Sequence, residues 1–289
     1  MITRFAPSPT GPLHLGHAYS ALLAHDAARR TGGTFVLRIE DIDRSRSRPE
    51  WEQKIYDDLA WLGVTWDAPP MRQSDRIPSY NSALLTLWKR GLLYPCTCTR
   101  RDIAAAASAP QEGGEPAFGP DGLIYPGTCR AKTASNALAP PDGQALRLDM
   151  SKALAGLGAD HAFSFEEVDL LTGNKAKRIH FTPADMTSTV GDIILSRKDF
   201  PASYHLSVVL DDAAQDVSHV IRGKDLFDAT MIHVVLQHLL GLKTPRYTHH
   251  RLIRDEQGKR LAKRDDSRAI SRYRDDGVSP EEIRTMVGL

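Results

Sequence analysis

The sequence predicts an α/β protein in which a parallel sheet is interrupted by an inserted, loop-rich subdomain. The parallel sheet is predicted by the start of the chain, where "TRFAPSPTG", a helical pattern over residues 15–30 and "TFVLRIED" follow one another as strand, helix and strand. Such a unit pairs its two strands in parallel through a right-handed crossover. The insertion is predicted by a change at Tyr94, where a cysteine pair leads into a stretch rich in glycine, proline and alanine.

Each further element follows from the local pattern. The first helix carries apolar residues near one face and is stopped by Gly32-Gly33, and "TFVLRIED" is typical of a buried strand. "ALRLDM" and "HAFSFEEVDLLTG" indicate strands of a small antiparallel subdomain, and strands return in "GDIILSRKDFPASYHLSVVLDD" and "VSHVIRGKDL". Asp211-Asp212 are interpreted as the cap of a turn. Helices are predicted over residues 15–30, 49–62, 77–90, 102–107, 229–240 and 280–286.

Composition excludes several classes of protein. The 289 residues are 41% hydrophobic and 25% charged, and 37 basic residues against 36 acidic ones leave a net charge of +1. Any nucleic-acid contact must therefore come from a local patch. The three cysteines do not form a secreted disulfide framework, the N-terminus has no apolar leader, and no apolar run is long enough to span a membrane. We expect a cytoplasmic monomer without membrane contact.

The first candidate site lies where the proline-braced loop turns into the first helix. A helix N-terminus at the carboxyl end of a parallel strand attracts anions, and His14 and His17 can donate hydrogen bonds to phosphate oxygens. Gly16 between them removes a side chain, so that a flat base can lie against the backbone. The alternative is a pair of ordinary surface histidines. The position between a βα loop and a helix favours the phosphate site.

This stretch is similar to a known signature. "RFAPSPTGPLHLGH" resembles that of the glutamyl- and glutaminyl-tRNA synthetases, a class I branch, with "HLGH" at the position of the HIGH motif. The resemblance implies a class I synthetase fold with a Rossmann-like parallel sheet, and ATP with Mg²⁺ as a substrate. It implies that His14, Gly16 and His17 bind ATP. The two histidines would stabilise the transition state at phosphorus while the amino acid's carboxylate attacks the α-phosphate.

A second stretch, "GKRLAKRDD", resembles the KLSKR form of that family's KMSKS loop. Lys263 matches the lysine that binds ATP and neutralises pyrophosphate charge in the transition state, a role that suits a compact ammonium group. Arg260 and Ala262 stand where the pattern has lysine and serine. These departures concern the rate of glutamate activation more than the prediction that the enzyme activates glutamate. Taken alone, the stretch would be interpreted as a basic surface loop.

A glutamate site is predicted from charge. Arg4, Glu40 and Arg222 lie at or near the ends of predicted strands, where neighbouring strands of one sheet would deliver them to a shared cleft. Arginine pairs bidentately with carboxylates, and a carboxylate suits the ammonium group. The resemblance implies Glu40 for the α-amino group and Tyr204 with the arginines for the side-chain carboxylate. The glutamate-binding residues that the resemblance implies are Arg4, Ala6, Ser8, Glu40, Tyr204 and Arg222. His205 departs from it, because asparagine is usual there.

The cysteines form a candidate metal site. Cys96 and Cys98, together with Cys129 and Tyr125, offer three thiolates and a phenol oxygen, and a tetrahedral zinc takes sulfur readily. Spacing alone leaves zinc and three reduced structural cysteines equally open. Part of the resembling family has a Cys-x-Cys…Tyr-x-x-x-Cys zinc site here. The resemblance therefore implies one structural zinc ion that staples the inserted subdomain.

The end of the chain narrows the resemblance. It runs from residue 2 to about residue 266, and the 265–289 segment is too short for the helical domains with which a glutamyl-tRNA synthetase reads the anticodon. A catalytic core of this kind resembles the stand-alone glutamyl-Q tRNA(Asp) synthetases. That resemblance implies ATP-dependent activation of L-glutamate and its transfer to queuosine in the anticodon loop of tRNA(Asp), the anticodon stem-loop being the partner. Queuosine carries a cyclopentene cis-diol that resembles the ribose diol of a terminal adenosine.

Two other functions stay open. The chain could be a glutamyl-tRNA synthetase fragment or paralogue that charges a tRNA 3′ end, or a non-catalytic RNA-binding relic that uses the zinc segment. A glutamine-specific enzyme is disfavoured by the two arginines. The expected organisation is a nucleotide-binding domain in two halves, an inserted zinc-containing, acceptor-binding-like subdomain, and a stem-contact-like segment with the basic loop and a short helix. Their boundaries are predicted at residues 1–94 and 186–240, 95–185, and 241–289, respectively.

Overall fold

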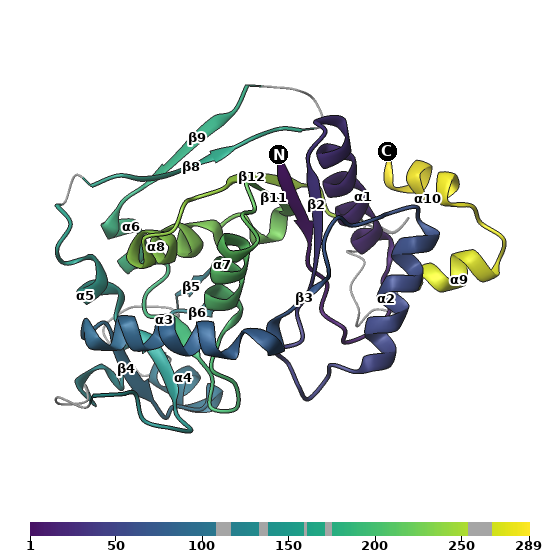
Figure 1. Ribbon diagram of the computed structural model, residues 1–289. Helices are drawn as coiled ribbons and strands as arrows, with labels where there is room; N and C mark the ends of the chain where they lie inside the picture. The colour runs from purple at the N-terminus through teal and green to yellow at the C-terminus, as the bar shows by residue number, and fades with distance from the viewer. Residues whose placement is uncertain (108–116, 133–137, 159–160, 171–174, 254–267) are drawn as a thin grey trace.

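A computed structural model describes residues 1–107, 117–132, 138–158, 161–170, 175–253 and 268–289 (Figure 1). The strands are β1 (Ile2–Phe5), β2 (Thr34–Ile39), β3 (Met71–Arg72), β4 (Leu93–Cys96), β5 (Phe118–Gly119), β6 (Gly122–Leu123), β7 (Ala145–Leu148), β8 (Phe163–Glu167), β9 (Lys177–Phe181), β10 (Ile194–Ser196), β11 (His219–Gly223) and β12 (Arg246–His250). The α-helices are α1 (Leu15–Arg30), α2 (Pro49–Trp61), α3 (Ile77–Lys89), α4 (Arg100–Ala107), α5 (Met150–Leu154), α6 (Pro183–Thr189), α7 (Tyr204–Ala214), α8 (Thr230–Leu240), α9 (Ile270–Asp275) and α10 (Pro280–Val287).

The predicted βαβ unit is confirmed. β1 pairs in parallel with β2 from Ile2↔Thr34 to Phe5↔Leu37, and β2 continues in parallel to β3. β11 lies beside β1, where the backbone N–H of Ser218 donates to the carbonyl of Ile2 at 3.0 Å, and β11 pairs in parallel with β12. The carboxyl ends of β1, β2 and β11 therefore meet at one edge, the place where parallel α/β sheets bind ligands.

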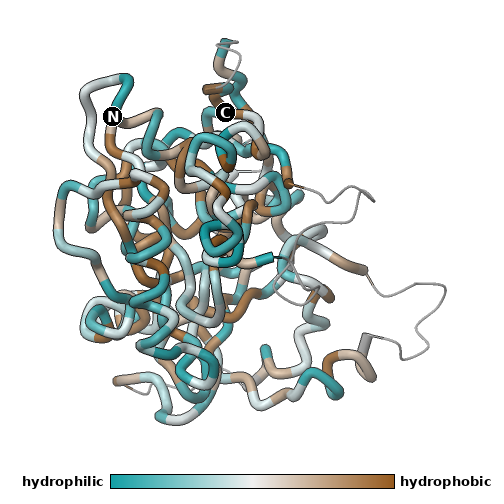
Figure 2. The backbone as a smooth tube through the Cα atoms, turned by 90° about the vertical axis from the view of Figure 1, so that its right-hand side faces the viewer, coloured by the Kyte–Doolittle hydropathy of each residue, from teal (hydrophilic) through white to brown (hydrophobic). Residues whose placement is uncertain are grey.

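Helices from both ends of the chain pack beside strands β1 and β2. α1 carries Ala18, Leu22 and other small or apolar residues into the core, and α10 packs on its outer side (Figure 1). Both Nη atoms of Arg284 on α10 donate to the carboxylate of Asp26 on α1, at 2.7 and 3.0 Å. The colouring by hydropathy in Figure 2 shows apolar stretches mainly inside the body and polar ones mainly along its outer turns.

The inserted region contributes to two sheets. β4, β7 and β10 form an antiparallel sheet, in which β7 is the one strand that was predicted for the small subdomain. β8 does not join β7, contrary to the prediction. It pairs with β12 at Tyr247↔Glu167 and forms a long hairpin with β9. Phe163 and Phe165 on β8 are buried in the same apolar cluster as Tyr247, and this long-range packing leaves no local signal in the sequence.

One element has a different type from the one predicted. "SYHLSVVLDD" was expected to be a strand with a turn at Asp211-Asp212, but it forms α7, whose N-cap Ser203 accepts a hydrogen bond from the N–H of Leu206. Seven of the eleven residues of this helix are buried, and a histidine, a serine and both aspartates are among them, so the sequence shows no clear polar face. Both aspartates are therefore buried inside a helix instead of capping a turn.

Helices α5, α6 and α9 and strands β3, β4, β5, β6, β9 and β12 were not predicted, whereas the six predicted helices are present with ends shifted by at most about two residues. In the described part of the chain, none of the helices has both the length and the apolar character needed to cross a bilayer.

Candidate active site

A cavity of about 470 Å³ opens at the carboxyl ends of β1, β2 and β11. The structure brings to it every residue predicted to bind ATP or glutamate that lies in the described part of the chain. These residues are Arg4, Ala6, Ser8, His14, Gly16, His17, Glu40, Tyr204 and Arg222. Lys263, with Arg260 and Ala262, lies outside the described residues. The described flanks of that segment reach the site, because Ile253 lines the cavity and Ala269 forms a backbone bridge with His14.

The two histidines are fixed by the first turn of α1. The Nδ1 atom of His14 accepts from the N–H of Gly16 at 3.1 Å, and Nδ1 of His17 accepts from the N–H of His14 at 3.2 Å. Because each Nδ1 is an acceptor, each neutral ring carries its proton on Nε2, where it can be donated to an anion. The ring centroids are 3.8 Å apart. This is the donor arrangement that a phosphate requires at a helix N-terminus.

Gly16 has a further role that the sequence did not indicate. A Cβ atom at this position would lie 3.0 Å from Cε1 of His14 and 3.2 Å from its Nδ1. Contacts this short force the neighbouring ring to move, so the absence of a side chain lets the imidazole of His14 fold back onto the helix. A flat base against the backbone is therefore one use of Gly16, and the seating of His14 is another.

A buried network of charges holds the first arginine and the acid. Asp212 Oδ1 accepts from Nε of Arg4 at 3.0 Å and from Nη1 of Arg38 at 2.6 Å, and Nη2 of Arg38 donates to Glu40 at 3.2 Å. Burial by itself would raise the pKa of Asp212, but the charges of Arg4 and Arg38 outweigh it and hold that pKa below its usual range. Asp212 is therefore the counterion that keeps two guanidinium groups in the core.

Glu40 is shifted in the opposite direction. Burial raises the pKa of its carboxyl group, and the charges of Arg38 and Arg4 only partly counter this effect. The group lies against the cavity with 11% of its side chain exposed. A cation that binds beside it would restore the ionised form, which is the behaviour expected of a carboxylate that receives an ammonium group.

Arg222 is held on several sides. Its Nε donates to Nε2 of His249 at 3.1 Å and its Nη1 to Nδ1 of His233 at 3.0 Å. Its Nη2 donates to the carbonyl of Leu226 at 3.1 Å and to the hydroxyl of Thr230 at 2.7 Å. Within the described residues, four of the five guanidinium N–H groups are thus engaged, and one on Nη1 has no acceptor.

Tyr204 connects this cavity to a second one. It is the first residue of α7, and burial raises the pKa of its hydroxyl. The second cavity, of about 570 Å³, is also lined by Tyr204, and it extends past His205 and Asp121 to Tyr125 beside the cysteines. Leu226 also lines both cavities, which therefore adjoin at Tyr204 and Leu226.

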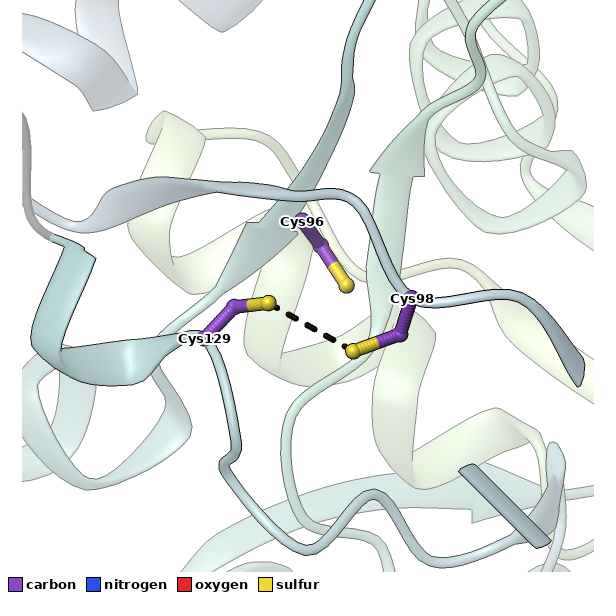
Figure 3. Close-up of side chains that lie close together, drawn as sticks. All are labelled: Cys96, Cys98 and Cys129. Carbon is purple, nitrogen blue, oxygen red and sulfur yellow. Dashed lines mark hydrogen bonds between the residues drawn. The ribbon is translucent and has the colours of Figure 1, made fainter. Parts of the chain in front are cut away.

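The three cysteines converge as Figure 3 shows, with Cys96 at the end of β4, Cys98 two residues later and Cys129 from the loop after β6. Their sulfur atoms lie within 4.8 Å of one another, and Cys98 and Cys129 are 3.4 Å apart. The hydroxyl oxygen of Tyr125 is 3.3 Å from Cys98 Sγ and 3.6 Å from Cys96 Sγ. Tetrahedral zinc needs sulfur atoms about 3.8 Å apart, so the donor set fits a zinc ion.

The electrostatics of this cluster favour a thiolate. Burial opposes ionisation, but hydrogen bonds to Cys129, first from Tyr125, lower the pKa of its thiol to about 6. Nε of Arg147 donates to Cys96 Sγ at 3.3 Å, and its guanidinium lies 3.8 Å from the centre of the Tyr125 ring. Burial raises the pKa of the Cys98 thiol, so the shift toward the thiolate, which is the form that binds metal, is found at Cys129.

Comparison with known proteins places this site in a family. The model of the class I tRNA synthetase catalytic domain for glutamate and glutamine (E and Q) matches residues 1–118 and 166–289. A glutamyl-Q tRNA(Asp) synthetase from Rhodobacter capsulatus is 59% identical over 295 residues, covering 100% of both chains. The chain belongs to the glutamyl-Q tRNA(Asp) synthetases. Another member of the family, from Symbiobacterium thermophilum, is 41% identical over 97% of this chain and 83% of its own length.

Solved structures agree with the assignment to the glutamyl-Q tRNA(Asp) synthetase family. The crystal structure of a glutamate-tRNA synthetase from Elizabethkingia anophelis superposes with a TM-score of 0.75 at 26% identity. It covers 100% of this chain, which spans 61% of that longer one. A methionyl-tRNA synthetase from Mycobacterium tuberculosis, at 11% identity and a TM-score of 0.61, shows the same fold. The predicted class I fold is thus confirmed, and the chain is a ligase-type enzyme.

Four residues that support the site of this glutamyl-Q tRNA(Asp) synthetase family member were not predicted from the sequence. Arg38 and Asp212 were not selected, and His233 and His249 were not considered as partners of Arg222. One signal was present in the sequence: Arg38 is an arginine inside the buried strand "TFVLRIED", where a charge requires a counterion. The counterion itself, 174 residues away, could not be identified without the fold.

Proposed function

We propose that this enzyme activates L-glutamate with ATP and transfers it to the queuosine of the tRNA(Asp) anticodon loop. One observation carries the proposal: a single cavity is lined by the N-terminus of α1 with its two histidines, by the buried carboxylate of Glu40, and by Arg4 and Arg222. The acceptor is proposed from the family, whose members in Rhodobacter capsulatus and Symbiobacterium thermophilum are named for glutamyl-Q and tRNA(Asp).

The first step forms glutamyl-adenylate. An oxygen of the α-carboxylate attacks the α-phosphorus of ATP, which enters with Mg²⁺, and pyrophosphate leaves with the electron pair of the broken P–O bond. Glu40 receives the α-ammonium group, and Arg4, Arg222 and Tyr204 receive the side-chain carboxylate. His14 and His17 donate from Nε2 to phosphate oxygens as charge develops on them. Lys263, which lies outside the described residues, would neutralise the pyrophosphate.

The second step forms the ester. A hydroxyl of the cyclopentene diol attacks the acyl carbon, AMP leaves with the electron pair of the acyl–phosphate bond, and the hydroxyl proton passes to a phosphate oxygen of the leaving AMP. The second cavity adjoins the first at Tyr204, which supports it as the place from which the nucleoside approaches. We assign residues 95–185 to acceptor binding and propose one structural zinc ion on Cys96, Cys98, Cys129 and Tyr125.

We further propose that the enzyme acts as a cytoplasmic monomer with the anticodon stem-loop as its RNA partner. The near-neutral charge supports a local RNA contact instead of an extended basic field.

The test is transfer of labelled glutamate, with ATP and Mg²⁺, to two pools of total tRNA, one with queuosine and one from cells unable to make it. Label in the queuosine pool alone is the expected result. Equal label in both pools would move the acceptor to the tRNA 3′ end. Glutamate-dependent exchange of pyrophosphate into ATP, measured without tRNA, tests the activation step separately. No label and no exchange would overturn the enzymatic function itself.

A further inference from the structure

Beyond the residues that face the cavity, a chain of hydrogen bonds leads away from Arg222. Nη1 of Arg222 lies 3.0 Å from Nδ1 of His233, and Nε2 of His233 lies 3.2 Å from Nδ1 of His205. Nε2 of His205 lies 3.1 Å from Oδ1 of Asp121 in the β5–β6 turn. The two histidines stand on the adjacent helices α7 and α8, which lie side by side (Figure 1). This chain of hydrogen bonds thus begins at Arg222 in the proposed glutamate cavity and ends at Asp121 in the second cavity.

The proton positions in this chain are determined by its first link. A guanidinium group can only donate, so Nδ1 of His233 accepts and its proton must be on Nε2. His233 therefore donates to Nδ1 of His205, which leaves the proton of His205 on Nε2, and that proton is donated to Asp121. Every link runs in one direction, from Arg222 to the carboxylate, and both imidazoles are neutral.

A second branch fixes the other side of the guanidinium in the same way. His249 accepts from Nε of Arg222 on its Nε2, and its Nδ1 donates to Oε2 of Glu167 at 2.8 Å. The first branch therefore consists of two imidazoles followed by a carboxylate, and the second of one imidazole followed by a carboxylate. Burial, followed by the charge of Arg222, lowers the pKa of His233 well below the usual value, so it remains an acceptor at neutral pH.

We propose that His233 and His205 are positioning residues that hold Arg222 so that one N–H of Nη1 points to the side-chain carboxylate of the substrate. This inference rests on the proposed function, because it assigns Arg222 to glutamate. A guanidinium restrained on Nε, Nη1 and Nη2 loses little conformational freedom when glutamate binds, which increases affinity without any new contact. Neither histidine needs to touch the substrate for this role.

The experiment compares two replacements of His233 in the full-length enzyme. His233→Asn keeps an acceptor near the position of Nδ1, whereas His233→Leu removes it. The readout is glutamate-dependent pyrophosphate exchange, with KM for glutamate and for ATP determined separately. We expect His233→Leu to raise the KM for glutamate by about tenfold or more, as for one lost hydrogen bond to a charged group, with the KM for ATP unchanged. His233→Asn should restore most of that loss.

Two further variants keep the test decisive if His233→Leu does not fold. His205→Leu removes the next link and should raise the KM for glutamate by a smaller factor, and Asp121→Ala, at the half-exposed end, should raise it least. The control is His238→Leu. His238 is an exposed residue on the same helix α8, and it is not part of this chain of hydrogen bonds. The variant should leave both KM values unchanged.

The outcomes separate the two proposals. If the wild-type enzyme shows no glutamate-dependent exchange, the proposed function fails. If the wild type is active and His233→Leu has the wild-type KM for glutamate, or if His233→Asn and His233→Leu raise it equally, the positioning role is wrong. Equal increases in the KM for glutamate and for ATP would also overturn it, because a loss of general structure affects both substrates.

Discussion

Asp212 on α7 accepts a hydrogen bond at 3.0 Å from Nε of Arg4 on β1, a residue 208 positions earlier in the chain. The same oxygen accepts from Arg38, so one carboxylate orients Arg4, which is proposed to bind glutamate, and balances the charge of Arg38, which is fully buried. The geometry of the substrate cavity is thus set by a residue outside it.

Replacement of Asp212 by asparagine tests this relationship. The amide keeps the shape but removes the charge, so two buried guanidinium groups lose their common counterion. We expect the free energy of unfolding to fall by about 3–5 kcal/mol, the range for breaking a buried ion pair, and glutamate affinity to fall with it. Urea denaturation measures the first effect and calorimetric titration of glutamate the second.

Asp216→Asn, at the exposed end of the same region, is the control for Asp212→Asn and should leave stability unchanged. Asp216 has a φ of 51°, a backbone conformation that asparagine adopts readily. Equal urea midpoints for Asp212→Asn and the wild type would show that Asp212 is not the counterion described here.

As the proposed partner of the α-ammonium group, Glu40 is expected to make glutamate binding depend on pH. Its pKa is raised above the ordinary value of 4.5, and only its ionised form attracts the α-ammonium group. Binding therefore releases a proton whenever Glu40 is protonated in the free enzyme, and affinity falls as the pH falls through the raised pKa. Titration calorimetry between neutral and mildly acidic pH should show this decrease.

The Glu40→Gln enzyme should bind glutamate about tenfold or more weakly at neutral pH, the loss expected for a hydrogen bond to a charged group. Its affinity should also lose the pH dependence that Glu40 contributes. An affinity that rises on acidification in the wild type would contradict the assignment of Glu40 to the ammonium group, since the sign would be reversed.

The cysteine cluster predicts one zinc ion per chain. Cys129→Ser removes the thiol whose pKa is lowered, and we expect the purified variant to have lost the metal. Tyr125→Phe keeps the ring but removes the phenol oxygen, so it should retain zinc more weakly and lose it first to a chelator. Elemental analysis of each protein measures the metal directly.

Thr97→Ser, between the first two cysteines, is the matched control and should contain as much zinc as the wild type. Wild-type protein purified without chelator and found free of metal would leave the cluster as three reduced cysteines. Equal zinc in Tyr125→Phe and the wild type under chelation would exclude the tyrosine as the fourth ligand.

The sequence predicted the parts of the site that local pattern determines. His14, Gly16 and His17 follow a strand and open a helix, and α1 has the predicted bounds of residues 15–30. Glu40 and Arg222 could be placed together because the carboxyl ends of parallel strands share one edge. These predictions needed only short-range order and one rule of topology.

The remainder depended on contacts that no local pattern contains. α7 was expected to be a strand because its valines favour strands and its burial removes the polar face that marks a helix. Asp212 was consequently interpreted as a turn residue, and the role of His205 could not be considered, because His233 approaches it from another helix. Because α7 was misidentified as a strand, neither the hydrogen bond from Arg4 to Asp212 nor the link from Arg222 through His233 to His205 could be predicted.

Gly16→Ala provides a test in which activity and stability are expected to change independently. The added Cβ would lie 3.0 Å from Cε1 of His14, so the imidazole must move by a few tenths of an ångström away from the position fixed by the N–H of Gly16. Because His14 is assigned to the phosphates, we expect kcat/KM for ATP in pyrophosphate exchange to fall by about tenfold, and the KM for glutamate to change little. Stability should stay equal or rise by up to about 1 kcal/mol, since alanine restricts the unfolded chain more than glycine does. Gly158→Ala, where a Cβ meets nothing within 4 Å, is the control: it should leave kcat/KM for ATP unchanged, while its stability should rise for the same reason by up to about 1 kcal/mol. A Gly16→Ala enzyme with wild-type kcat/KM for ATP would show that the seating of His14 is not required for activation.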